Sequence, residues 1–132
     1  MDKRIIFLFT LYLIGRKIRS HYKNKNEDGM LTAAILNLLY QQGETVTKLA
    51  HKLSTKVSAI SEKIMTLEKE KLVKKMKVDD GREVFVELTQ EGKNKIANLI
   101  TIMQKHCSFV TQKLTDKEIR TVLPILGKLT DS

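Results

Sequence analysis

The chain begins with a strongly apolar segment, residues 5–14, in which Thr10 is the one interruption. Ile18 and Tyr22 continue the apolar positions from Ile14 in steps of four, so the pattern predicts one helix that runs beyond the apolar segment. A membrane-spanning helix needs about 18 or more consecutive apolar residues, which is longer than this segment. We therefore expect a helix that other parts of the protein bury.

A secretory signal peptide is the alternative interpretation of this segment, because Lys3 and Arg4 precede it and a signal has an apolar centre of about 7 to 15 residues. A signal peptide also ends at a cleavage site of small residues. Here the sequence GRKIR follows the apolar segment, with no Ala-x-Ala pattern nearby. The buried helix is favoured, and an export signal or anchor stays open as the weaker alternative.

Helical periodicity continues after a polar break at residues 23–29. Residues 30–40 form an Ala- and Leu-rich apolar helix, and a short amphipathic helix follows it with Val46, Leu49, Ala50 and Leu53 on one face. A further helix is predicted from a narrow stripe of four apolar residues, Val57, Ile60, Ile64 and Leu67. Ser54 or Thr55 can cap the first turn of that helix.

The pattern then changes to the alternation that is typical of strands. Val84, Val86 and Leu88 alternate with Glu83, Phe85 and Glu87. The Asp80-Gly81 pair is a strong hairpin signal, because a type I′ turn needs positive φ at both central positions. We therefore expect a β-hairpin over about residues 73–88.

Two more helices are predicted after the hairpin. Thr89 can cap a helix that runs over about residues 90–113. Thr115 and Glu118 have the spacing of a capping box, which predicts that a last helix follows over residues 118–129.

The composition and net charge of the chain indicate what kind of partner it binds. The chain has 132 residues, 42% of them hydrophobic and 30% charged, so it is long enough for one compact domain with its own core. Its formal net charge of +9 favours a polyanionic partner, either nucleic acid or an anionic membrane. Cys107 is the single cysteine, which excludes an internal disulfide and fits a cytoplasmic location.

Two short helices joined by a tight turn and followed by a β-hairpin form the plan of a winged helix-turn-helix. The second helix offers a face of small or polar residues that fits the major groove of DNA, about 12 Å wide. That face comprises Ser58, Ala59, Glu62 and Thr66, flanked by Ser61 and Lys63. Its alternative interpretation is a plain exposed surface.

The predicted hairpin carries further cations. Arg82 stands at its tip, where an arginine can enter a narrow minor groove, although a turn residue paired with Asp79 or Asp80 is the alternative. Lys74, Lys75 and Lys77 on the preceding strand can contact phosphates.

Residues 49–93 resemble the MarR family of transcriptional regulators. The matching elements, which occur in order and without a gap, are Leu49-Ala50 with Leu53, Leu67-Glu68-Lys69 before Leu72-Val73, Asp79-Asp80-Gly81-Arg82, and Leu88-Thr89-x-x-Gly92. The resemblance implies a homodimer that binds a pseudo-palindromic DNA operator, usually to repress transcription. It also implies a small-molecule pocket between the dimerisation helices and the DNA-binding lobe.

The resemblance implies roles for individual residues. The implied base contacts are Ser58, Ala59, Ser61 and Glu62, with Lys56 and Lys63 near phosphates and Arg82 in the minor groove. Glu62, Lys63 and Thr55 depart from the family pattern, since Arg often stands at position 62 and aliphatic residues at the other two. The implied interlocking of the terminal helices predicts a dimer interface of Ile5, Ile6, Phe9, Tyr12, Leu13, Val122, Leu123 and Leu126.

The expected architecture is therefore mainly α with a small β-hairpin wing, a winged helix-turn-helix flanked by dimerisation helices. We expect an N-terminal dimerisation helix and linker at 1–30, the DNA-binding lobe at 31–92, and C-terminal dimerisation helices at 93–132. Residues 1–26 carry seven basic and one acidic side chain, whereas residues 44–95 carry twelve and nine. The charge excess of the first segment is the larger, so a membrane role of the N-terminus stays open.

Other functions find less support. A winged helix that binds proteins rather than DNA, and a basic membrane-associated protein, are the alternatives to a DNA-binding regulator. No paired-carboxylate motif or Gly-rich phosphate loop indicates an enzyme. His21, His106 and Cys107 are metal-ligand types, but adjacent helical residues point about 100° apart, so we expect neither a metal site nor a cofactor.

Overall fold

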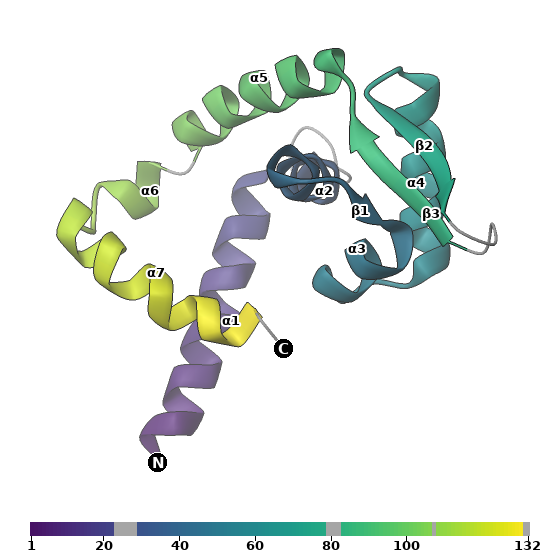
Figure 1. The fold of residues 1–132 in the computed structure, drawn as a ribbon. Helices are drawn as coiled ribbons and strands as arrows, with labels where there is room; N and C mark the ends of the chain where they lie inside the picture. Colours follow the sequence, from purple (N-terminus) through teal and green to yellow (C-terminus); the bar gives the residue numbers. More distant parts are fainter. Residues whose placement is uncertain (23–28, 79–82, 107, 131–132) are drawn as a thin grey trace.

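A computed structural model describes residues 1–22, 29–78, 83–106 and 108–130 of the chain (Figure 1). It is mostly helical with one small antiparallel sheet, which confirms the predicted winged-helix fold class. The elements are α1 (Lys3–Tyr22), α2 (Gly29–Gln41), β1 (Glu44–Thr45), α3 (Val46–Lys52), α4 (Val57–Lys69), β2 (Val73–Val78), β3 (Glu83–Leu88), α5 (Gln90–His106), α6 (Ser108–Thr111) and α7 (Asp116–Thr130).

The wing is a three-stranded sheet in the order β1-β3-β2. β2 and β3 pair antiparallel from Val73 opposite Leu88 to Val78 opposite Glu83, which confirms the predicted hairpin. The sequence did not predict β1, whose Glu44 pairs with Val86. A strand of two residues is too short to show an alternating pattern, and its pairing depends on β3, which lies some 40 residues further along the chain.

One hydrophobic core joins α2, α3, α4, the wing and the first turns of α5, and we call this unit the winged-helix lobe. Its largest fully buried side chains are Ile35, Leu36, Leu49, Ile60, Ile64, Val86 and Ile96. The apolar faces of α2, α3 and α4 meet here, and no described residue of α1 or α7 belongs to this core.

The closing motif of the family resemblance joins the wing to α5. Thr89 Oγ1 donates a hydrogen bond to Lys71 O (2.7 Å) and accepts one from Gly92 N (3.0 Å), which confirms the predicted cap. A Cβ at Gly92 would clash with the backbone oxygen of Leu72. Position 92 therefore needs glycine because the first turn of α5 lies directly against the chain that leads into β2.

The two other predicted caps have different outcomes. Thr115 N donates to Glu118 Oε1 (2.9 Å) and Glu118 N donates to Thr115 Oγ1 (3.1 Å), which confirms the capping box. The predicted cap of α4 by Ser54 or Thr55 is wrong, because the N-cap is Lys56 and makes no side-chain cap hydrogen bond. Thr55 Oγ1 instead donates to Leu53 O (3.0 Å), which stabilises the turn after α3.

Two expectations about the helices are also corrected. Val57 was expected in the buried stripe of α4, but it is 48% exposed, because the first residue of the helix lies beyond the reach of the core. The helix expected over about 90–113 ends earlier, because residues 112–113 form a turn. The described helical residues there are those of α5 (Gln90–His106) and α6 (Ser108–Thr111), and residue 107 lies outside the described residues.

The terminal helices lie outside the core of the lobe. In Figure 1, α1 (purple) and α7 (yellow) extend away from the wing. No described residue of either helix is buried within the single chain. His21 stacks on Phe109 at 4.2 Å between ring centroids, and this contact connects α1 with α6. Among the described helices, none combines the length and the apolar character that crossing a membrane requires.

Candidate nucleic-acid interface

The helix-turn-helix is formed by α3 and α4. Leu53 N donates to Leu49 O (3.0 Å) and Thr55 N donates to Ala50 O (2.9 Å), so the chain closes α3 tightly before it turns. Ser54 adopts a positive φ of 51° in this turn. The apolar residues Leu49 and Ile60 then hold the two helices together in the core.

The structure brings the predicted base-contacting residues together on the outer face of α4. Ser58, Ser61 and Glu62 are exposed, whereas Ala59 and Lys63 are half-buried. Within the described part of the chain, no side-chain hydrogen bond engages the hydroxyls of Ser58 and Ser61. Thr66 differs, since its hydroxyl donates to Glu62 O (3.2 Å). The two serines thus keep their donors and acceptors available at the surface.

Two residues on this face were missed as contact candidates. Met65 is 50% exposed and lies on the helix between the directions of Ser61 and Glu62, and the exposed Val57 lies one turn before Ser61. The helical spacing places Met65 away from the buried stripe, so the sequence contained the signal for this residue. Val57 was misassigned because it continues the stripe in sequence.

The wing lysines have different surroundings. Lys75 Nζ lies 3.3 Å from Glu68 Oε1 of α4, and Lys74 Nζ lies 3.6 Å from Glu87 Oε2 of β3. For Lys56 and Lys77, by contrast, no ion pair occurs with any residue that the structure describes. An anion that binds these two ammonium groups would not have to displace a described acidic side chain. Arg82 and the rest of the wing tip lie outside the described residues.

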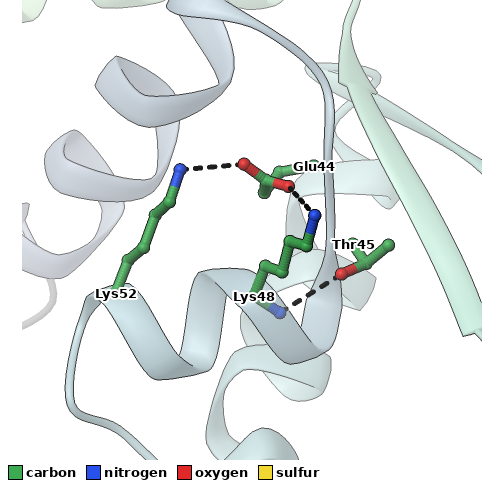
Figure 2. A network of polar contacts seen from close by, with 4 residues as sticks. All are labelled: Glu44, Thr45, Lys48 and Lys52. Carbon is green, nitrogen blue, oxygen red and sulfur yellow. Dashed lines mark hydrogen bonds and ion pairs between the residues drawn. The ribbon is translucent and has the colours of Figure 1, made fainter. Parts of the chain in front are cut away.

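A buried carboxylate connects the wing to the first helix of the helix-turn-helix. The Glu44 side chain, only 9% exposed, lies at the β1–α3 junction and accepts a hydrogen bond from Lys52 Nζ at 2.9 Å (Figure 2). Lys48 Nζ lies 3.9 Å from its other oxygen. The hydrogen bond from Lys52 holds the pKa of Glu44 below its ordinary value.

This network fixes the start and the end of α3. Thr45 caps the helix by accepting a hydrogen bond from Lys48 N (3.2 Å), while Lys52 in the last turn returns to Glu44. Glu44 is itself paired with β3 through the backbone of β1. Glu44 therefore fixes the position of α3 relative to the wing: its side chain binds Lys52 of α3, and its backbone pairs with β3.

The fold and the outer face of α4 define a winged-helix, DNA-binding transcription regulator of the MarR-like type, as the sequence predicted. The chain belongs to the family described as transcriptional regulator SarA/Rot, whose model matches residues 17–99, more than half of the chain. The description of this family is that of regulators of transcription. A comparison with curated proteins gave no significant match.

Solved structures are similar over nearly the whole chain. The transcriptional regulator BldR from Sulfolobus solfataricus has a TM-score of 0.80 at 20% identity, covering 98% of this chain and 97% of its own. A MarR-family regulator from Rhodococcus sp. RHA1 has a TM-score of 0.81 at 16% identity, covering 99% and 96%. A MepR-like protein complexed with pseudoligands has a TM-score of 0.63 at 27% identity, covering 98% and 95%.

Proposed function

We propose that this regulator acts as a homodimer that represses transcription by occupying a pseudo-palindromic DNA operator. The observation that carries this proposal is the exposure of apolar side chains along both terminal helices. Phe9 of α1 is 60% exposed and Leu123 of α7 is 61% exposed in the single chain. Apolar surface of this extent on two helices favours association with a second copy.

The proposed interface consists of one apolar face on each helix. On α1, Ile5, Ile6, Phe9, Tyr12 and Leu13 are all exposed, and on α7 Val122 and Leu123 are exposed while Leu126 is half-buried. A helix gains most of its stability from packing an apolar face rather than from intrinsic propensity. A second subunit would supply that packing. The terminal helices expose apolar side chains, whereas the winged-helix lobe buries them. We propose on this basis the division into dimerisation helices (1–30 and 93–132) and a DNA-binding lobe (31–92).

The proposed DNA contacts belong to α4 and the wing. In the dimer, α4 of each subunit enters the major groove with Ser58, Ala59, Ser61 and Glu62 towards the bases. A glutamate accepts a hydrogen bond from cytosine N4, so Glu62 favours cytosine and repels phosphates. The proposed phosphate contacts are Lys56, Lys63 and Lys77, whereas Lys75 is engaged by Glu68. Arg82 is the proposed minor-groove contact.

Light scattering tests the dimer. We expect a dimer at micromolar concentration, and we expect Leu123→Asp to produce a monomer because it buries a charge in the interface. Thr121→Asp is the matched control, since Thr121 is exposed on the polar side of the same helix. A monomeric parent protein, or a Leu123→Asp variant that remains dimeric, would contradict the proposed interface.

We also propose that binding of a small acidic ligand causes the regulator to dissociate from its operator. A hollow of about 480 Å³ beside α1 is lined by Tyr12, Gly15, Arg16, Arg19 and Ser20. Arg16 donates a hydrogen bond to the Tyr12 hydroxyl (3.2 Å), and its guanidinium lies 5.7 Å from the centre of the Tyr12 ring. Two arginines beside an aromatic ring suit an aromatic carboxylate.

Benzoate is a simple probe for this hollow. Millimolar benzoate is expected to weaken DNA binding by the parent protein but not by Arg16→Ala. Lys17→Ala removes the same charge from α1 without altering a residue that lines the hollow, so it should respond like the parent. An unchanged affinity of the parent in benzoate would contradict release by an aromatic carboxylate.

A further inference from the structure

We infer that Val57 and Met65 are specificity-determining residues of α4 that contact the 5-methyl groups of thymine in the major groove. This inference rests on the proposed placement of α4 in that groove. It assigns a role to two apolar side chains that the core does not use. Val57 is 48% exposed and Met65 is 50% exposed, although the other large apolar residues Ile60, Ile64 and Leu67 of α4 are buried.

Met65 lies on the side of α4 that carries the exposed polar residues, and Val57 lies at the edge of that side, next to the buried stripe. At 100° per residue, Met65 falls between Ser61 and Glu62, and Val57 falls beside Ser61 at the first turn. The first turns of a recognition helix come closest to the base edges. An apolar pair separated by two turns can therefore contact methyl groups at different base pairs of one half-site.

The chemistry of the face supports methyl recognition. Guanine is usually recognised by bidentate Arg or Lys, and adenine by bidentate Asn or Gln. The outward residues of α4 from Val57 to Met65 include no Arg, Asn or Gln, and its cations Lys56 and Lys63 lie at the margins. Serine hydroxyls accept or donate to any base and discriminate weakly. Glu62 towards cytosine and the apolar pair towards thymine remain as the discriminating contacts.

Removing one methyl group tests this assignment directly. Deoxyuridine pairs like thymidine but lacks the 5-methyl group, so it can replace each thymidine of a bound site in turn. The site is obtained by selection from a random duplex pool. Loss of one buried methyl corresponds to a decrease in affinity of about three- to fivefold. We expect this decrease for the parent protein at one or two positions of each half-site.

The variants identify the side chain responsible. Val57→Ala and Met65→Ala should each bind thymidine and deoxyuridine equally at one of these positions, because the partner of the methyl group is gone. Met76→Ala is the matched control, since Met76 is also exposed but belongs to the wing, and it should keep the full discrimination. Measuring each variant on both DNAs also corrects for any effect of the methyl group on DNA shape.

The outcomes separate this inference from the proposed function. If the parent binds its selected site specifically but does not distinguish thymidine from deoxyuridine at any position, methyl recognition is wrong and the regulator proposal stands. If the parent distinguishes them and both alanine variants keep the distinction, the assignment to Val57 and Met65 is wrong. If no site is selected at all, the proposed operator binding itself is contradicted.

Discussion

At the scale of single residues, the buried carboxylate of Glu44 connects strand β1 of the wing with the last turn of α3. Its contact with Lys52 at 2.9 Å is shorter than the contacts of Lys75 with Glu68 (3.3 Å) and of Lys74 with Glu87 (3.6 Å), and its side chain is more buried than those of Glu68 and Glu87. Burial makes such a pair sensitive to the removal of one partner, whereas exposed pairs contribute little to the free energy of unfolding.

Glu44→Gln is expected to lower the free energy of unfolding by about 1 kcal/mol at pH 7, because the amide hydrogen-bonds Lys52 more weakly than a carboxylate does. The pKa of Glu44 is lowered on folding, so its stabilising effect is complete above the unfolded pKa of about 4.3 and is lost as the pH falls through the folded pKa. The difference between parent and variant should therefore shrink from pH 7 towards pH 3 in urea denaturation.

Glu87→Gln provides the control for this experiment. Glu87 pairs with Lys74 at 3.6 Å, but both side chains are substantially exposed. No measurable change of stability is expected. Equal effects of the two substitutions, or a difference for Glu44→Gln that does not depend on pH, would contradict a special role of the buried pair.

Gly92 gives a second prediction at this scale. Gly92→Ala should destabilise the protein by about 1–3 kcal/mol, because the added Cβ would overlap the carbonyl oxygen of Leu72. Gly15→Ala is the control, since no other described part of the chain lies within 4 Å of its Cβ position and alanine favours the helix. A lower melting temperature for Gly15→Ala than for Gly92→Ala would contradict the close approach of Gly92 to the Leu72 carbonyl.

At the scale of elements, β2 presents two lysines on one face with different surroundings. Lys75 and Lys77 are two residues apart, so their side chains point to the same side of the sheet. Lys75 is held by Glu68 at the end of α4, whereas Lys77 makes no ion pair with the described residues. A lysine that already has an acidic partner displaces fewer counterions when it approaches a phosphate.

Lys77→Ala is therefore expected to reduce the slope of log affinity against log salt by about 1 on random duplex DNA. Lys75→Ala should leave this slope close to that of the parent. The slopes come from fluorescence anisotropy between about 50 and 200 mM salt. Identical slopes for the two variants would show that the ion pair with Glu68 does not decide which lysine contacts DNA.

The elements with strong periodicity were predictable from the sequence. The hairpin over 73–88 and the helices α2 and α3 have the expected positions, because local patterns determine them. The strand β1 and the exposure of Val57 were not predictable, since both depend on which distant segments reach that place.

At the scale of the whole molecule, the core and the proposed dimer interface lie in different segments. The buried residues belong to positions 33–96, whereas the exposed apolar residues gather on α1 and α7. The sequence predicted that Ser58, Ser61 and Glu62 of α4 face outward, because a buried stripe leaves the opposite face to solvent, but it did not predict the exposure of Val57. It did not predict which lysines are paired, because Glu68 and Glu87 are brought to them only by the fold.

The apolar character of segment 5–14 is also explained at the scale of the whole molecule. The single chain leaves this helix exposed, and the proposed second subunit would supply the burial that the sequence predicts. The central claim is therefore that two copies of α4 bind one operator at a fixed spacing. In helix-turn-helix dimers this spacing is one turn of DNA, about 10–10.5 base pairs between half-sites, or a multiple of it.

Selection of bound sequences from a random duplex pool measures that spacing most directly. We expect an enriched site with two inverted half-sites whose centres are about one or two DNA turns apart. Enrichment of a single unrepeated motif, or of no motif, would contradict a dimer that binds a pseudo-palindromic operator.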